Sequence, residues 1–122
     1  MHENVRAWIE ALRSGEYQQA RETLRVNDEY CCLGVACDIS GLHQWERLDE
    51  TSIYTYDEHH NILPLTVIAW MELDIHENWG SLQGDRSGDR GLLLDLITMN
   101  DSGASFEEIA DHIEIYFKER YR

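Results

Sequence analysis

The sequence has little positive charge. Its 122 residues include 10 lysines and arginines against 24 acidic residues, which gives a formal net charge of −14. Lys118 is the only lysine. So negative a chain repels the phosphates of nucleic acids and the headgroups of anionic lipids. Direct binding to nucleic acid or to a membrane is therefore disfavoured, and a protein partner with a basic surface is favoured.

Several other features are scarce. No run of about 18 or more apolar residues occurs, so no transmembrane helix is expected. The first residues lack the basic and then apolar layout of a signal peptide. One proline and eight glycines leave no room for a long flexible linker, and we expect one domain over residues 1–122. Three cysteines are an odd number without a secretion signal, which predicts reduced thiols and a cytoplasmic setting.

The hydrophobic pattern predicts an α+β fold, with a small antiparallel sheet or hairpins covered by about five short helices. Asn4 is the expected N-cap of the first helix. Ser105 and Glu108 form a capping box before the last helix. Residues 16–22 fit either a further helical turn or an extended connection. Helices are expected over residues 4–13, 32–40, 64–74, 92–99 and 106–117. A short hairpin is expected over residues 23–30, with its turn at residues 27–28, and strands over residues 45–48 and 53–56.

The least polar ten-residue window, YCCLGVACDI at residues 30–39, contains all three cysteines. Its small residues Gly34 and Ala36 predict an element buried against close neighbours. The spacing C-C-x4-C is not that of a zinc site, and no motif of a catalytic nucleophile surrounds it. We interpret the thiols as packing groups. Two alternatives remain. One is a metal site that a distant histidine completes, and the other is a chemically reactive thiol.

A glycine-rich stretch at residues 76–91 predicts a long loop. Its segment GDRSGDRG lacks the G-K-[ST] ending and the preceding apolar strand of a phosphate-binding loop. Arg86 and Arg90 could still hold an anion there.

Two sets of residues are candidates for binding, and no catalytic residue, metal or cofactor is expected. Between Arg47 and Arg86 the sequence has carboxylates but no lysine or arginine, which suggests an acidic docking face. The candidates for a partner protein are Asp49, Glu50, Asp57, Glu58, Glu72, Asp74 and Glu77. The candidates for a small ligand are Arg25, Tyr30, Cys31, Asp38, Arg86, Arg90 and Asn100.

Several stretches resemble a family of small, uncharacterised phage- and prophage-encoded proteins. They are WIEALRSGEYQQ at residues 8–19, LR at 24–25, YCCLGVACD at 30–38, ILP at 62–64 and MNDSGASFEEIADHIE at 99–114. Together they span about half of the chain, and similar proteins often have glycine where Ala20 stands. The resemblance implies a viral origin and an accessory role, and it supplies no catalytic residue.

These observations favour a phage accessory protein that acts by binding, as an acidic inhibitor of a host protein such as an antiviral defence factor. An acidic face can occupy a basic nucleic-acid channel. Sequestration of a host signalling nucleotide is the alternative, with arginines and aromatic rings as its binding groups. A thiol- or metal-dependent hydrolase is a third hypothesis.

Overall fold

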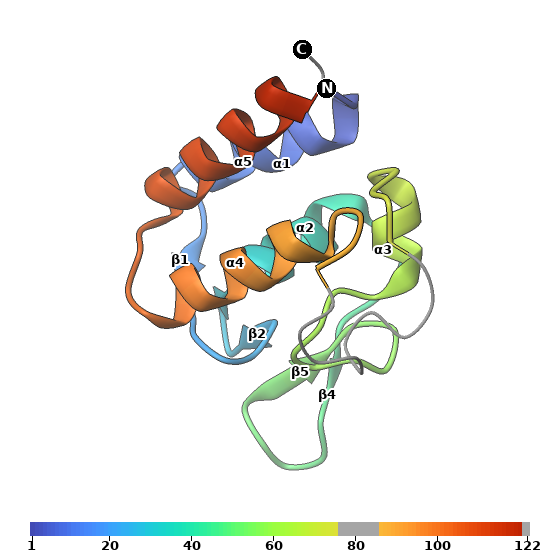
Figure 1. The fold of residues 1–122 in the computed structure, drawn as a ribbon. Helices are drawn as coiled ribbons and strands as arrows, with labels where there is room; N and C mark the ends of the chain where they lie inside the picture. Colours follow the sequence, from blue (N-terminus) through green and yellow to red (C-terminus); the bar gives the residue numbers. More distant parts are fainter. Residues whose placement is uncertain (76–85, 121–122) are drawn as a thin grey trace.

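The structure is a computed structural model that describes residues 1–75 and 86–120 (Figure 1). Its helices and short strands confirm the α+β class. None of the helices in these ranges has the length and apolar character needed to cross a bilayer. The elements are α1 (Glu3–Arg13), β1 (Gln18–Gln19), β2 (Arg25–Val26), β3 (Glu29–Tyr30), α2 (Cys32–Ser40), β4 (Glu46–Arg47), β5 (Ile53–Thr55), α3 (Leu65–Trp70), α4 (Arg90–Asp101) and α5 (Phe106–Arg120).

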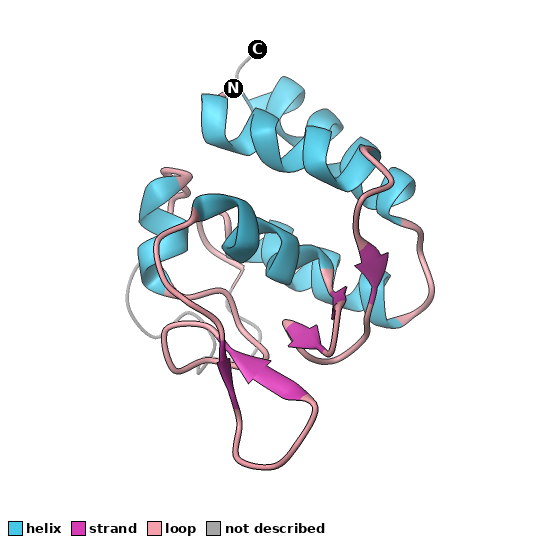
Figure 2. Ribbon diagram, turned by 180° about the vertical axis from the view of Figure 1, so that it is seen from behind, coloured by secondary structure: helices cyan, strands magenta, loops and turns pink. Residues whose placement is uncertain are grey.

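Helix α2 lies at the centre of the fold and packs against α1, α3 and α4. All of its residues from Cys32 to Cys37 are buried. Helices α1 and α5 lie side by side across it, and the β4–β5 hairpin extends from the opposite end of the molecule (Figures 1 and 2). The prediction that residues 30–39 form the central buried element is confirmed.

Close packing of α2 against Leu24, the residue directly before β2, requires glycine at position 34. A Cβ atom built there would lie 1.9 Å from the carbonyl oxygen of Leu24, far inside the contact distance of the two atoms. Leu24 is itself fully buried, and its carbonyl accepts a hydrogen bond from the amide of Cys31 at 3.1 Å. The glycine that is unfavourable within a helix therefore permits the contact between α2 and the backbone of Leu24.

The sheet has the strand order β1-β3-β2-β5-β4. The pairs β2–β3, β2–β5 and β4–β5 are antiparallel, as expected, whereas β1 pairs with β3 in parallel. The sheet is therefore mixed. Residues 16–22 include an extended strand rather than a further turn of helix. Gln18 and Gln19 carry no strand signal of their own, so the pairing with β3 determines their conformation.

The capping box is confirmed, because Ser105 Oγ accepts from the amide of Glu108 and Glu108 Oε1 accepts from the amide of Ser105, each at 3.2 Å. The expected N-cap Asn4 is wrong. His2 caps α1 through its side chain, and α1 begins at Glu3. Helix α4 begins at Arg90, two residues before the expected start.

The third helix ends earlier than expected, at Trp70 rather than near Asp74. Its end is a left-handed turn in which the amide of Glu72 donates to the carbonyl of Ala69 and the amide of Leu73 to that of Ile68. Glu72 has a φ of 54°, a conformation that glycine usually supplies at this position. A glutamate there gives no sequence signal for the end of a helix.

Candidate functional site

The three thiols are buried and form no disulfide. Burial raises the pKa of Cys31 to about 11 and raises the pKa values of Cys32 and Cys37 well above their ordinary range. Uncharged thiols are poor nucleophiles and poor metal ligands at neutral pH. Within residues 1–75 and 86–120, no group of three histidine, cysteine or carboxylate side chains is placed to hold a metal ion. The geometry supports packing as the role of the thiols.

Thiol titration provides a first test. We expect less than one thiol per chain to react with an aromatic disulfide reagent at pH 8 in the native protein, and all three to react after denaturation. Rapid reaction of a native thiol would contradict the packing role and reopen the hypothesis of a reactive cysteine.

Asn100 is buried, and both polar atoms of its side chain form hydrogen bonds within the fold. Its Oδ1 accepts from the amide of Cys32 at 3.2 Å and from Nε2 of Gln19 at 2.9 Å. Its Nδ2 donates to the carbonyl of Ala20 at 2.7 Å. The side chain thus joins α4 to the start of α2 and to the end of β1. It also borders a small hollow lined by Glu22, Cys31, Cys32, Leu33, Asn61, Ile97, Asn100 and Asp101.

This hollow is poorly suited to a nucleotide. The carboxylates of Glu22 and Asp101 stand at its wall, and none of its lining residues is a lysine or arginine. A phosphate group would be repelled there.

Arg25 and Tyr30 are brought together by the sheet. They are direct partners across β2 and β3, and Arg25 is likewise opposite Tyr54 of β5. The guanidinium carbon of Arg25 lies 4.1 Å from the ring centre of Tyr54, 5.2 Å from that of Tyr30 and 5.6 Å from that of Trp45. The sequence placed two members of this cluster, Arg25 and Tyr30, in the ligand set. Tyr54 joins them through its cross-strand pairing with Arg25, and Trp45, directly before β4, joins them through its ring contact with Tyr30. No local sequence motif indicates these contacts.

Asp38 of α2 lies beside this cluster and is held by it. Its two carboxylate oxygens accept from the hydroxyl of Tyr17 at 2.6 Å and from Nε1 of Trp45 at 3.0 Å. Burial and the adjacent carboxylate of Asp38 raise the pKa values of Tyr17 and Tyr30. Both hydroxyls therefore remain protonated at neutral pH, and that of Tyr17 donates to Asp38.

Arg86 and Arg90 do not form an open anion site. Arg86 pairs with Asp95 at 2.8 Å and donates to the carbonyl of Gly91 at 3.2 Å. Arg90 lies in α4 rather than in a loop, and only 5% of it is exposed. The seven candidates for a small ligand are thus spread over separate places, and their joint role stays a prediction.

The acidic candidates lie in two regions. Asp49, Glu50, Asp57 and Glu58 belong to the β4–β5 hairpin and the turn that follows it, and Glu46 joins them. Among the described residues, none of Glu46, Asp49, Glu50 and Glu58 forms an ion pair with a lysine or arginine. Asp57 lies 3.6 Å from Nε2 of His43. The remaining candidates, Glu72, Asp74 and Glu77, follow α3 in the sequence. Glu72 contacts His2, and Asp74 contacts Arg120. Glu77 lies outside the described residues.

A hollow at the base of the hairpin is lined by His43, Gln44, Glu46, Asp57 and Glu58. The Nε2 atom of His43 lies 3.1 Å from the hydroxyl oxygen of Thr66, and that hydroxyl also lies 3.2 Å from Asp57 Oδ2. Because Thr66 and Asp57 approach the same ring nitrogen of His43, they do not form a nucleophile–base–acid relay.

The model of one protein family matches residues 1–117. The chain belongs to the DUF8296 family, described as a domain of unknown function. No curated protein and no solved structure matches it.

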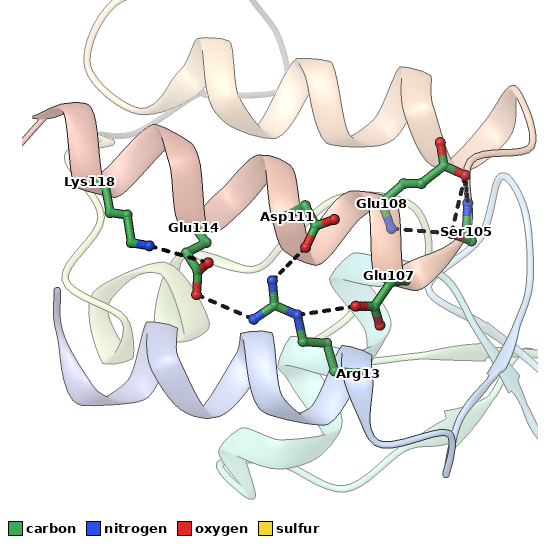
Figure 3. A network of polar contacts seen from close by, with 7 residues as sticks. All are labelled: Arg13, Ser105, Glu107, Glu108, Asp111, Glu114 and Lys118. Carbon is green, nitrogen blue, oxygen red and sulfur yellow. Dashed lines mark hydrogen bonds and ion pairs between the residues drawn. The ribbon is translucent and has the colours of Figure 1, made fainter.

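The DUF8296 domain also has acidic residues on α5, but these have their own cation. Arg13 of α1 lies 2.6 Å from Asp111, 3.3 Å from Glu114 and 3.7 Å from Glu107 (Figure 3). Lys118 approaches Glu114 from the other side at 3.5 Å. Arg13 therefore partly neutralises this row of carboxylates and ties the two helices together.

Replacement of Arg13 by glutamine should destabilise the DUF8296 domain in a pH-dependent way. Arg13 lowers the pKa of Glu114, so their pairing contributes stability above the unfolded pKa and loses it as the pH falls through the folded value. We expect a small decrease in the urea midpoint at pH 7 that disappears near pH 3, where carboxylates are protonated. A difference that persists unchanged at pH 3 would show that Arg13 acts through packing of its aliphatic part instead.

Proposed function

We propose that this protein is a phage accessory protein that acts by binding, and that it occupies a basic surface of a host protein in the host cytoplasm. A factor of antiviral defence is the kind of host protein that such an inhibitor would block. The formal charge of −14 supports a basic partner. The phage setting rests on the resemblance of the stretches around residues 8–19, 30–38 and 99–114.

The main support for this proposal comes from the exposure of the hairpin carboxylates and from their missing ion pairs within the described chain. Glu46, Asp49, Glu50 and Glu58 are exposed and form no ion pair with a lysine or arginine of the described chain, whereas the α5 carboxylates surround Arg13. The hairpin also extends away from the helices (Figure 2). Such charges need no rearrangement to meet a partner's arginines and lysines, and they accelerate the encounter at low salt.

The surroundings of Arg25 favour a protein partner over a nucleotide. Its Nε atom donates to the carbonyl of Asn27 at 2.6 Å, and its NH2 group lies 3.5 Å from Asp28. The guanidinium is thus already engaged, and a nearby carboxylate opposes a phosphate. The same cluster of arginine and aromatic rings is typical of residues that contribute most to protein–protein interfaces.

Neutralisation of the hairpin tests the proposal. The variant Asp49→Asn/Glu50→Gln/Glu58→Gln is compared with Glu10→Gln/Glu16→Gln/Glu119→Gln, which removes equal charge from exposed positions on or near α1 and α5. Each tagged variant is used to capture proteins from infected host cells at several salt concentrations, with quantitative mass spectrometry as the readout. We expect the hairpin variant to lose its captured protein about tenfold or more, and the control to keep it.

Three results would contradict the proposal. Equal losses in both variants would show that overall charge, rather than the hairpin, drives the association. No specific capture by the unmodified protein would argue against a binding function of this kind. Capture that is unchanged between 50 mM and 500 mM salt, roughly a threefold change in Debye length, would exclude an electrostatic docking face.

A further inference from the structure

The first turn of α1 is capped by an unusual residue. Nδ1 of His2 accepts a hydrogen bond from the amide of Asn4 at 3.0 Å, and the backbone of His2 is extended, as at an N-cap. Serine, threonine, aspartate and asparagine are the residues preferred there. A ring nitrogen that accepts a hydrogen bond carries no proton, so the neutral imidazole has its proton on Nε2.

The other ring nitrogen reaches a different part of the fold. Nε2 of His2 lies 2.6 Å from Oε2 of Glu72, in the turn that ends α3. A second link runs in parallel, because Nδ2 of Asn4 donates to the carbonyl of Trp70 at 2.8 Å. The start of α1 is therefore attached to the end of α3, about seventy residues further along the chain.

Glu72 occupies a backbone position that does not suit it. Its φ of 54° lies in the left-handed region, where glycine is favoured after a helix end. The turn itself gains nothing from a glutamate side chain. The contact with His2 supplies a reason for a carboxylate at this position.

We propose that His2 and Glu72 form a pH-dependent clasp between α1 and α3. Protonation of the imidazole adds a proton to Nδ1, which can then no longer accept from the amide of Asn4. The imidazolium stays attached to Glu72 as an ion pair. Acidification thus removes the cap of α1 and keeps its link to α3. This inference does not depend on the proposed function.

In the described chain the His2 ring has one ion-pair partner and charged neighbours in sequence. Glu72 faces it from the α3 turn, and Glu3 and Arg6 are its charged neighbours in the first turn of α1. The amide of Arg6 donates to the carbonyl of His2 at 3.1 Å and so reports on the same turn.

Nuclear magnetic resonance between pH 5 and pH 8 tests the clasp, since imidazole groups titrate in this range. We expect the amide resonance of Asn4 to shift with the same midpoint as the ring resonances of His2. Asparagine caps a helix without titrating, so in His2→Asn the Asn4 amide should stay constant across the range. His112→Gln is the control, and it should leave the Asn4 titration unchanged.

An Asn4 amide that stays constant while His2 titrates would overturn the proposal, as would an Asn4 titration that persists in His2→Asn. The ring nitrogen shifts at pH 8 must also report a proton on Nε2, and a proton on Nδ1 would contradict the cap.

A second experiment tests the link between His2 and Glu72. Glu72→Gly should accelerate hydrogen exchange of the Arg6 amide more at pH 5 than at pH 8, after correction for intrinsic rates. Equal acceleration at both values would exclude the ion pair as the link that survives acidification.

Discussion

Replacement of Gly34 by alanine is expected to reduce the free energy of unfolding by about 3 kcal/mol or more, a large part of the stability of a small domain. The new Cβ would stand 1.9 Å from the carbonyl oxygen of Leu24. That oxygen is backbone, and it is fixed by the hydrogen bond from Cys31, so it has no side-chain rotamer by which to move away. Relief requires α2 to separate from the backbone at Leu24, which would disrupt the centre of the core.

Gly91→Ala is the matched control. Gly91 also lies in a helix, but the nearest atom to a Cβ there is NH2 of Arg86 at 3.3 Å, the end of a flexible side chain. Alanine is favoured over glycine in a helix by roughly 1 kcal/mol, so this variant should be neutral or more stable. Urea unfolding followed by tryptophan fluorescence measures both variants. A Gly34→Ala protein within about 1 kcal/mol of the unmodified chain would show that the contact with Leu24 is not rigid.

Replacement of Asn100 by leucine is expected to reduce stability by roughly 3–5 kcal/mol, since it leaves two buried backbone groups, the amide of Cys32 and the carbonyl of Ala20, without this partner. The amide of Cys32, the carbonyl of Ala20 and the side-chain amide of Gln19 all bond to this residue. Leucine keeps the volume and cannot replace any of these bonds. The amide of Cys32 opens α2, so its loss affects the central helix directly.

A comparison within the same hollow separates this effect from a general one. Asn61 lines that hollow but is exposed, so Asn61→Ala should change stability by less than about 0.5 kcal/mol. Asn100→Asp keeps an acceptor for Cys32 and Gln19 but turns an oxygen toward the carbonyl of Ala20, so it should also be strongly destabilised. A stable Asn100→Asp protein would show that the bond to Ala20 is dispensable.

Local sequence patterns predict the helices of this protein well. In α1 the apolar residues Val5, Trp8, Ile9 and Leu12 recur at helical spacing, and all four are buried. The capping box before α5 is similarly local, because its two partners lie within one turn. These features depend on residues close in sequence, and so a single sequence is enough to find them.

Features that depend on distant partners escaped prediction. The strand at Gln18–Gln19 forms because β3 is available to pair with it, and His2, which caps α1, also contacts Glu72 far along the chain. The site shows the same division. Arg25 and Tyr30 are brought together because they lie on neighbouring strands of a predicted hairpin. The side chain of Asn100, in contrast, forms its hydrogen bonds with segments about eighty residues away in the sequence.

The pairing of α1 with α5 has a consequence for how the chain folds as it is synthesised. Arg13 meets Asp111 across 98 positions of sequence, and α5 is the last of the described elements to leave the ribosome. Until then the face of α1 that packs against α5 has no partner, and the ordering of the long intervening chain opposes early pairing. Folding therefore completes only after synthesis of α5, and during that interval the uncovered face of α1 is open to chaperones and to association with other nascent chains.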